Sequence, residues 1–383
     1  MTAPLEHFRS VLMADAELQS LLGPLEDDAA FADAALAVAK ARGIALDRDT
    51  LTTVTRRDPA ALSRFLPAPA TATAWPSAGW LPVDVPMLAT GIYVDWAWIG
   101  PPTGRVFDEV ARRRALDRPL SRLLRWRMTL ADFVRGYGGA EKPAGLIFHM
   151  SRCGSTLVSR MLAALPGALS VSESPAINAV LQLPYLYPAS PAQEHAAILS
   201  AMLGAFSRRD PSFIKLDAWH ALALPQFRNA APDVPWTFLY REPVEVLVSQ
   251  QRASGPQLLS GILPSRVYGI AGFETMPEAE LSARVLEKIC AAAAARDGGL
   301  LCDYRELPQA VEHRILPHFG VACSETEREA LARTACAGSK IAGHFVPDSG
   351  DKQSEADEEL RALAERHVGG VHRQLQRLRA TQR

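Results

Sequence analysis

One short polar loop of this chain places a cation, a thiol, a glycine and two hydroxyls in consecutive positions: Arg152, Cys153, Gly154, Ser155 and Thr156. An apolar run typical of a strand, 145–150, precedes the loop, and a run typical of a helix, 156–165, follows it. A strand that turns into a helix gathers backbone N–H groups and the positive end of the helix dipole in one place. Gly154 permits a ligand to approach the backbone closely, and the hydroxyls add donors. We therefore expect the loop to bind an anion.

The loop departs from the Walker A pattern G-x-x-x-x-G-K-[ST], in which a lysine after the glycine reaches the β- and γ-phosphates and a hydroxyl binds magnesium. Here the cation, Arg152, comes before the glycine, and position 149 holds no glycine. A transferring sulfuryl group carries less charge than a phosphoryl group, so donors and one or two cations can stabilise it without a metal. Arg152 can offer forked donors to the bridging oxygen and to the terminal sulfonate. The loop therefore favours sulfuryl transfer.

A second candidate anion site lies about 90 residues further on, in the segment WTFLYREPVEVLVSQQR. Arg241 ends a strand-like run, and Ser249 follows eight residues later, about two helical turns, after a proline suited to begin a helix. Taken alone, the pair is more typical of a surface arginine and a helical serine than of a binding site. Together with the loop, it predicts a clamp for a second phosphate remote from the first.

The two segments together resemble the sulfotransferase family that uses 3′-phosphoadenosine 5′-phosphosulfate. The family's 5′-phosphosulfate loop has the form [KR]-[SC]-G-[ST]-[ST], which RCGST matches, and its 3′-phosphate element pairs an arginine after a strand with a serine eight residues later. The resemblance covers about residues 143–375. It implies this nucleotide as co-substrate, no metal, and phosphosulfate binding by Arg152, Gly154, Ser155 and Thr156.

The same resemblance implies that Arg241 and Ser249 hold the 3′-phosphate. The segment LLCDYREL is similar to the family's YEDL segment, whose tyrosine lies near the nucleotide, which makes Tyr304 a further candidate. A late segment, AGSKIAGHFVPDSGDKQ, has the Gly, Ser and Lys content of the family's nucleotide-covering loop but lacks its Arg-Gly-Trp pattern. From it we take Ser339 and Lys340 as candidates.

Sulfuryl transfer also needs a general base for the acceptor hydroxyl. Glu173 directly follows the second strand-like run, 21 residues after Arg152, a spacing similar to that of the catalytic glutamate of tyrosylprotein sulfotransferases. The resemblance implies that Glu173 is the base; the alternative is a solvated or helix-capping carboxylate. The cytosolic sulfotransferases use a histidine instead, and no histidine of this chain falls in a matching motif.

The third strand-like run, 212–217, begins the segment SFIKLDAWH, which carries further charged groups. Family segments with a lysine at this strand end imply that Lys215 assists the leaving phosphate. Asp217 is expected merely to neutralise that lysine, and His220 is typical of a structural histidine. The predicted catalytic set is therefore Glu173, Arg152 and Lys215.

These candidates need a scaffold, and the sequence from Gly145 onward supplies one. Apolar runs typical of strands occur at 145–150, 168–173, 212–217, 236–241 and 299–304. Stretches typical of helices lie between them, including 192–207, 244–252 and 279–296. Strands buried on both faces and separated by helices predict an α/β fold with a P-loop-containing, doubly wound parallel sheet flanked by helices.

The part of the chain before this scaffold has a different sequence pattern. Apolar residues at three- and four-residue steps predict a small helical domain at 1–64. Residues 4–55 resemble Nif11-type leader segments of ribosomally made peptides, which implies a recognition module; a helical appendage that packs on the core is the alternative. Residues 65–142 are predicted as a linker and an arginine-rich accessory region, and 143–383 as the sulfotransferase-like α/β domain.

Within the middle region, 66–86 is rich in Pro, Ala and Thr and predicts a linker or an irregular packed arm. The run 91–100 alternates as a strand or hairpin does, and 105–127 predicts a helical stretch. Eight arginines stand against three acids between 101 and 130. That excess indicates either a solvated helix face or a docking face for an acidic partner.

Composition narrows the classes of function. The 383 residues are 48% hydrophobic and 22% charged with a net charge of −1, which predicts a globular protein and argues against one that coats nucleic acid. The N-terminus lacks the apolar core of a secretory signal, and the longest uncharged stretch, 174–193, contains four prolines, so we expect no membrane span. Five scattered cysteines without a CxxC pair indicate reduced thiols and a cytoplasmic location.

The sequence thus predicts a sulfotransferase that acts on a hydroxyl of a small molecule or a peptide. Two alternatives stay open: a P-loop kinase with a degenerate loop, and a nucleotide-binding or leader-binding scaffold without turnover. Magnesium-dependent ATP binding would indicate the kinase. No motif identifies the acceptor or the oligomeric state.

Overall fold

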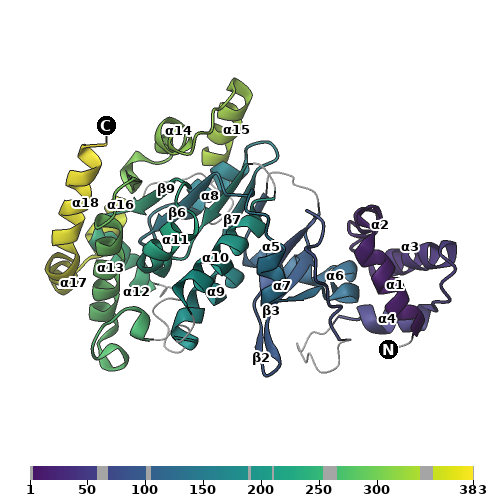
Figure 1. The fold of residues 1–383 in the computed structure, drawn as a ribbon. Helices are drawn as coiled ribbons and strands as arrows, with labels where there is room; N and C mark the ends of the chain where they lie inside the picture. Colours follow the sequence, from purple (N-terminus) through teal and green to yellow (C-terminus); the bar gives the residue numbers. More distant parts are fainter. Residues whose placement is uncertain are drawn as a thin grey trace.

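A six-stranded parallel sheet forms the centre of the molecule in the computed structural model (Figure 1), which describes residues 3–57, 68–100, 105–188, 191–208, 211–252, 265–336 and 348–382. Its strands, in spatial order, are β10 (Gly299–Asp303), β9 (Trp236–Tyr240), β6 (Gly145–His149), β8 (Ser212–Lys215), β7 (Leu169–Ser172) and β4 (Arg105–Phe107). All neighbouring pairs run parallel. The predicted parallel α/β sheet is therefore confirmed, and each of the five predicted strand runs contains one of these strands.

Helices connect successive strands of this sheet. They are α8 (Ser155–Ala163), α9 (Pro175–Leu186), α10 (Ala192–Phe206), α11 (Leu224–Ala230), α12 (Pro243–Arg252) and α13 (Glu278–Ala294). From β6 the chain moves first to β7, on one side of it, and later to β9, on the other side. Because parallel crossovers are right-handed, this reversal puts α8 on one face of the sheet and α10 to α13 on the opposite face. The carboxyl end of β6 is the point of reversal, where doubly wound sheets bind ligands.

The C-terminal part adds helices around the sheet: α14 (Leu316–His318), α15 (Glu325–Cys336), α16 (Ser349–Glu355), α17 (Glu358–Leu363) and α18 (Gly370–Ala380). Helix α15 packs on α8, α16 packs on α12, and α18 packs on α13 and β10. The helix α16 thereby lies beside the helix that carries the predicted 3′-phosphate serine, Ser249. Among the described residues, no helix is long and apolar enough to cross a membrane.

The arginine-rich region is not one helical stretch as predicted for 105–127. Its first three residues form β4, which pairs with β7 at the edge of the parallel sheet. Asp108 then caps a helix by accepting a hydrogen bond from the Ala111 N–H at 3.0 Å. The helices are α5 (Glu109–Asp117) and α6 (Pro119–Leu124), and Arg125, with φ of 42°, ends the second. A short strand, β5 (Arg127–Thr129), and a helix, α7 (Leu130–Arg135), follow.

A second, antiparallel sheet precedes the parallel one. It comprises β1 (Trp80–Asp84), β2 (Met87–Leu88), β3 (Gly91–Trp98) and β5, with β3 paired to the other three. The predicted strand at 91–100 is confirmed by β3. The segment 66–86 is less irregular than predicted, because Trp80 anchors β1 in a cluster of tryptophans that also includes Trp98 and Trp126. These tryptophans form an apolar core, which the Pro and Ala content of 66–86 does not predict.

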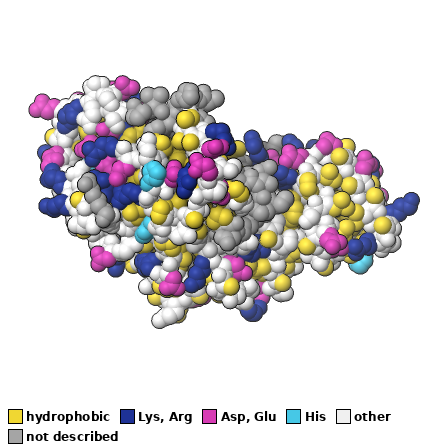
Figure 2. Space-filling model, turned by 90° about the horizontal axis from the view of Figure 1, so that it is seen from above, with side chains coloured by type: hydrophobic (Ala, Val, Ile, Leu, Met, Phe, Trp, Pro, Cys, Tyr) yellow, Lys and Arg dark blue, Asp and Glu magenta, His cyan; other side chains and the backbone are white. Residues whose placement is uncertain are grey.

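Four helices form the N-terminal part: α1 (Ala3–Ala14), α2 (Ala16–Leu22), α3 (Asp28–Ala41) and α4 (Arg48–Thr55). They lie at one end of the molecule (Figure 1) and pack on α6 through α1 and α4. The buried Arg9 of α1 donates hydrogen bonds to the carbonyls of Leu124 and Ala68, each at 2.8 Å. On the face shown in Figure 2, hydrophobic side chains are frequent at this end, whereas basic and acidic side chains intermingle over the rest.

Candidate functional site

The loop after β6 has the backbone of an anion-binding turn. Three of its residues, Ser151, Arg152 and Gly154, have positive φ angles of 78°, 51° and 84°. Two of these are not glycines, and each left-handed residue of that kind costs about 1–2 kcal/mol. Cys153, between Arg152 and Gly154, is not among the positive-φ residues, so the sign of φ alternates from Arg152 to Gly154, and such alternation turns successive N–H groups into one concavity that suits an anion. Helix α8 begins directly after Gly154, so its free N–H groups face the same concavity.

The loop side chains differ in how far they reach a ligand. Ser155 is 5% exposed at the first position of α8, Thr156 is exposed, and Arg152 is half-buried. Cys153, predicted among the nucleotide-binding residues, turns its side chain into the core, where Sγ donates to the Leu239 carbonyl at 3.2 Å. Burial raises the pKa of the Cys153 thiol to about 12. Only the backbone of Cys153 therefore remains to contact an anion.

Tyr304 connects the loop with the second predicted anion site. A Cβ atom added at Gly154 would lie 3.1 Å from Cδ2 of Tyr304 and 2.6 Å from Cδ1 of Leu307, so the loop lies directly against this tyrosine. The guanidinium carbon of Arg241 lies 3.9 Å from the centre of the same ring. Tyr304 is thus close to residues of both predicted anion sites, which are 89 positions apart (241 − 152) in the sequence.

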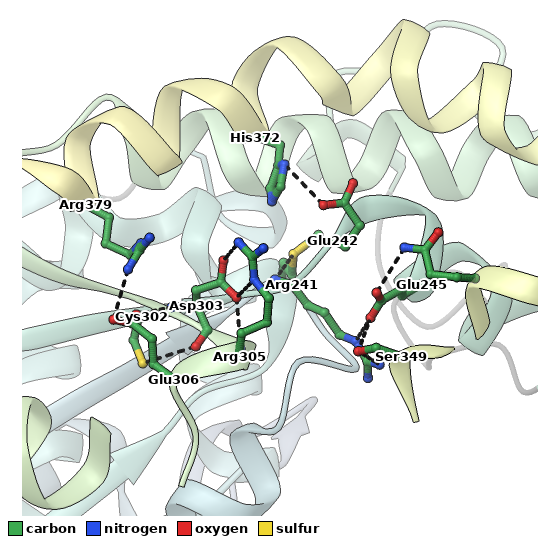
Figure 3. Close-up of polar contacts among 12 residues, drawn as sticks. Arg241, Glu242, Glu245, Cys302, Asp303, Arg305, Glu306, Ser349, His372 and Arg379 are labelled. Atoms are coloured by element: carbon green, nitrogen blue, oxygen red, sulfur yellow. Dashed lines mark hydrogen bonds and ion pairs between the residues drawn. The ribbon is translucent and has the colours of Figure 1, made fainter. Parts of the chain in front are cut away.

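The end of β10 holds Tyr304 in place. Asp303 accepts hydrogen bonds from the Arg305 backbone at 2.9 Å and from its guanidinium at 2.7 Å (Figure 3). Glu306 accepts from Arg314 at 2.8 Å and pairs with Arg379 of α18 at 2.9 Å. These bonds tie the turn after β10 to the C-terminal helix, so the tyrosine between them has a fixed backbone.

Arg241 is buried and engaged by carboxylates of the chain itself. Its Nε donates to Glu245 at 2.5 Å, and its Nη2 donates to the Ser349 hydroxyl at 3.2 Å (Figure 3). The same Nη2 donates to Asp348 at 2.6 Å. Asp348 also pairs with Lys352 at 2.8 Å. Burial raises the pKa of Asp348, but hydrogen bonds from Lys352 and Arg241 outweigh that effect and lower it to about 2. A phosphate that binds Arg241 through Nη2 must therefore replace Asp348.

The remaining predicted nucleotide residues lie near this group or outside the described residues. Ser249 lies on α12, two turns after Arg241, and is 8% exposed. Ser339 and Lys340 lie outside the described residues. Asp348 belongs to the same late segment as those two, so the segment was recognised from the sequence but its acidic residue was not.

The predicted catalytic pair Glu173 and Lys215 is in contact. The Nζ atom of Lys215 lies 2.5 Å from Oε1 of Glu173, and the Glu173 N–H donates to the Lys215 carbonyl at 2.9 Å. Lys215 is buried at the end of β8, whereas the Glu173 side chain is 42% exposed. Glu173 has a positive φ of 53°, a conformation that non-glycine residues adopt at a cost. The turn after β7 is thus strained in a way that aims this carboxylate at the lysine.

His149, which the sequence did not single out, completes the group. Its Nδ1 accepts a hydrogen bond from the Ser151 N–H at 3.0 Å, so its proton resides on Nε2, which lies 2.7 Å from the Leu216 carbonyl and 3.5 Å from Glu173. Burial lowers the pKa of His149, although Glu173 opposes this. Burial raises the pKa of Glu173, but the His149 hydrogen bond and the Lys215 charge hold it below its ordinary value. His149 is a polar residue at the end of the otherwise apolar strand β6, and this position in the sequence could have identified it as a candidate.

Asp217 lies two residues beyond Lys215 on the same edge of the sheet. Its Oδ2 accepts a hydrogen bond from Nδ2 of Asn178 at 2.7 Å, and its side chain is 20% exposed. His220, as predicted, is fully buried and structural: its Nδ1 accepts from the Asp217 N–H at 3.2 Å, and its Nε2 lies 2.8 Å from Oδ1 of Asn178. Within the described residues, no group of three or more His, Cys, Asp or Glu side chains could hold a metal ion.

Comparison with known proteins yields similar structures but no sequence family. No family model matches the chain, and no curated protein matches it. The sulfotransferase domain from the curacin biosynthetic pathway is 14% identical with a TM-score of 0.36, over 62% of this chain and 97% of that domain. A sulfotransferase from Mycobacterium tuberculosis is 14% identical with a TM-score of 0.38, over 68% of this chain and 86% of that one.

The sulfotransferase domain of a Synechococcus olefin synthase is likewise similar, with 16% identity and a TM-score of 0.35 over 62% of this chain and 95% of that domain. Each of these three solved structures is a sulfotransferase or a sulfotransferase domain. Because the identities and TM-scores are low, we base the proposal below on the contacts within this chain.

Proposed function

We propose that this protein transfers a sulfuryl group from 3′-phosphoadenosine 5′-phosphosulfate to a hydroxyl of a small molecule or a peptide. The observation that carries the proposal is the position of Tyr304, which lies against both Gly154 of the loop and Arg241. One molecule with a phosphosulfate at one end and a phosphate at the other can reach both sites. The Glu173–Lys215 pair ends neighbouring strands of the same sheet edge, where the reacting bond would lie.

The residues present suit such a donor. The concave backbone of the loop and the start of α8 offer N–H donors, and Arg152 adds a cation. The close contact of Gly154 with Tyr304 and Leu307 leaves no space for a side chain there, so the glycine lets the loop pack against Tyr304. Arg241 and Ser249 hold the 3′-phosphate in this proposal, once Asp348 has moved from Arg241.

In the proposed step, the acceptor oxygen attacks the sulfur and a new O–S bond forms. The bond between sulfur and the bridging oxygen breaks, and its electron pair remains on the 5′-phosphate oxygen. Arg152 and Lys215 stabilise the charge that develops on that oxygen. The proton of the acceptor passes to a carboxylate of the protein; the role of Glu173 in accepting it stays a prediction.

Binding and turnover test the proposal separately. We expect 3′-phosphoadenosine 5′-phosphate to raise the melting temperature in magnesium-free buffer, and the sulfated donor to add one sulfuryl group to a member of a panel of phenols, alcohols and Tyr- or Ser-containing peptides, detected by mass spectrometry. The Arg152→Ala variant should lose turnover, whereas Arg160→Ala, which removes the same charge from an exposed position on α8, should retain it.

Two results would contradict the proposal. If wild-type protein does not bind the 3′,5′-bisphosphorylated nucleotide and no panel member gains a sulfuryl group, the protein is not a sulfotransferase of this kind. If it instead binds ATP only with magnesium, the kinase alternative replaces it. Nucleotide binding that persists without turnover for any acceptor would favour the scaffold alternative.

A further inference from the structure

Two carboxylates, not one, lie beside Lys215. Glu173 follows β7 and Asp217 follows β8, and these strands are neighbours in the sheet. Both carboxylates therefore lie at the edge where the reaction is proposed. A general base must accept a proton during the reaction, and it works best when its pKa is near the working pH. The surroundings of the two groups decide which of them meets this condition.

Glu173 is held as a stable anion. Its Oε1 lies 2.5 Å from the ammonium of Lys215 and 3.5 Å from Nε2 of His149, which carries a proton because Nδ1 is occupied by the Ser151 N–H. A carboxylate that already receives a short charged hydrogen bond gains little from a further proton. The same contact fixes the position of Lys215, which is buried and would otherwise be an isolated charge.

Asp217 receives a neutral donor instead. The donor is the amide nitrogen of Asn178, at 2.7 Å. The amide cannot turn around, because its oxygen accepts hydrogen bonds from Nε1 of Trp219 at 2.9 Å and from Nε2 of His220 at 2.8 Å. The His220 proton is on Nε2, since Nδ1 accepts the Asp217 N–H. The carboxyl group of Asp217 is thus oriented rigidly while its side chain keeps 20% exposure.

The charges around Asp217 weaken its acidity. Burial and the charge of Glu173 raise its pKa to about 7, against the opposing effects of Lys215 and Asn178. Burial lowers the pKa of His220 to about 3, so His220 faces Asp217 as a neutral ring. Burial and the Asp217 charge raise the pKa of Tyr268, so that phenol is neutral as well. Burial lowers the pKa of His149 too, so His149 is also neutral.

We propose that Asp217 takes the proton of the acceptor hydroxyl and that Glu173 acts as a positioning residue for Lys215. The inference rests on the proposed function. As the acceptor oxygen bonds to sulfur, its proton moves to a carboxyl oxygen of Asp217, and the bond to the bridging oxygen breaks. The proton then leaves Asp217 to solvent at its exposed edge. The reaction rate rises with pH until Asp217 is ionised, and levels off above that point.

The first experiment needs no acceptor. In protein labelled with ¹³C at the aspartate carboxyl carbons, NMR should show one resonance that titrates with a midpoint near pH 7 and is absent from Asp217→Asn. Asp233→Asn, which changes an exposed aspartate, should leave that resonance in place. If the Asp217 resonance titrates below pH 5, the inference fails even when the protein proves to be a sulfotransferase.

The second experiment measures kcat/KM against pH with the nucleotide donor and the best acceptor of the panel. Asp217→Asn should lower kcat by about 10²–10⁴-fold and abolish the rise near pH 7, with unchanged affinity for 3′-phosphoadenosine 5′-phosphate. Glu173→Gln should lower kcat and move the rise to lower pH without abolishing it, because Asp217 remains but the Glu173 charge that raises its pKa is gone. The reverse pattern, a rise retained in Asp217→Asn and lost in Glu173→Gln, would overturn the inference and make Glu173 the base.

Failure of the proposed function looks different. If the Asp217 resonance titrates near pH 7 but wild-type protein neither binds the nucleotide nor sulfates any acceptor, the proposed function is wrong and the role of Asp217 as its base falls with it. The NMR result thus separates an error about this carboxyl group from an error about the reaction.

Discussion

Replacing Asp348 by asparagine should tighten binding of 3′-phosphoadenosine 5′-phosphate, because Asp348 occupies the arginine that we assign to the 3′-phosphate. Its carboxylate lies 2.6 Å from Nη2 of Arg241 and 2.8 Å from Nζ of Lys352. Asparagine keeps the shape of the side chain but removes the charge that competes with a phosphate. Asp348 then no longer opposes the positive charges of Arg241 and Lys352, although Glu245 still pairs with Nε of Arg241.

The expected gain in binding free energy follows from the exposure of the Asp348–Arg241 ion pair. The Asp348 side chain is 42% exposed, and a partly exposed ion pair contributes at most about 1 kcal/mol. That is the free energy a phosphate must offset in the wild type and need not offset in the variant. Since about 1.4 kcal/mol corresponds to a factor of ten, we expect the dissociation constant to fall about fivefold.

Isothermal titration calorimetry can measure this effect with a matched control. Asp351→Asn removes the same charge from the same helix, α16, at an exposed position, and should change the affinity little at physiological ionic strength. Adenosine 5′-phosphate, which lacks the 3′-phosphate, should bind Asp348→Asn and wild type equally. An Asp348→Asn variant that binds the bisphosphorylated nucleotide no more tightly than Asp351→Asn would refute the assignment of Arg241.

Two further predictions concern the loop. Gly154→Ala should lower the free energy of unfolding in urea by at least about 1 kcal/mol more than Gly298→Ala, because both glycines have φ near 83° but only Gly154 has a neighbour within 3 Å of the added Cβ; equal losses would show that Leu307 yields freely. Cys153 should resist iodoacetamide in folded protein at pH 8 while the exposed Cys336 reacts, as judged by peptide mass spectrometry, and rapid labelling of Cys153 would contradict its burial.

The sequence predicts five strands of the central sheet well because they are buried on both faces and form short, largely apolar runs. It does not predict β4, at the edge of the same sheet, or β1, in the antiparallel sheet, for different reasons. β4 has three residues, begins with Arg105 and lies at the edge of the sheet, so its pattern resembles the helix that follows. β1 contains Pro82 and has an irregular register after it, which conceals a strand in a proline-rich stretch.

The sequence likewise predicts some residues of the candidate site and misses others. The loop, Arg241, Glu173 and Lys215 belong to short motifs at strand ends, where the position in sequence fixes the position in space. The residues that pair with these groups and shift their pKa values do not belong to such motifs. Asp348 is 107 residues from Arg241, and Asn178 reaches Asp217 from another helix. Contacts of this kind depend on packing between elements, and no spacing rule along the chain encodes them.

The buried guanidinium of Arg9 bears on how the N-terminal helices should be studied. It bridges two main-chain carbonyls of different segments, and Phe8 beside it is fully buried. Deleting α1 to α4 would remove that bridge and uncover apolar side chains, so loss of activity in a shortened protein would report misfolding as readily as lost recruitment of a peptide. Polar substitutions at Leu21, which is 59% exposed, leave the bridge intact and examine recruitment alone.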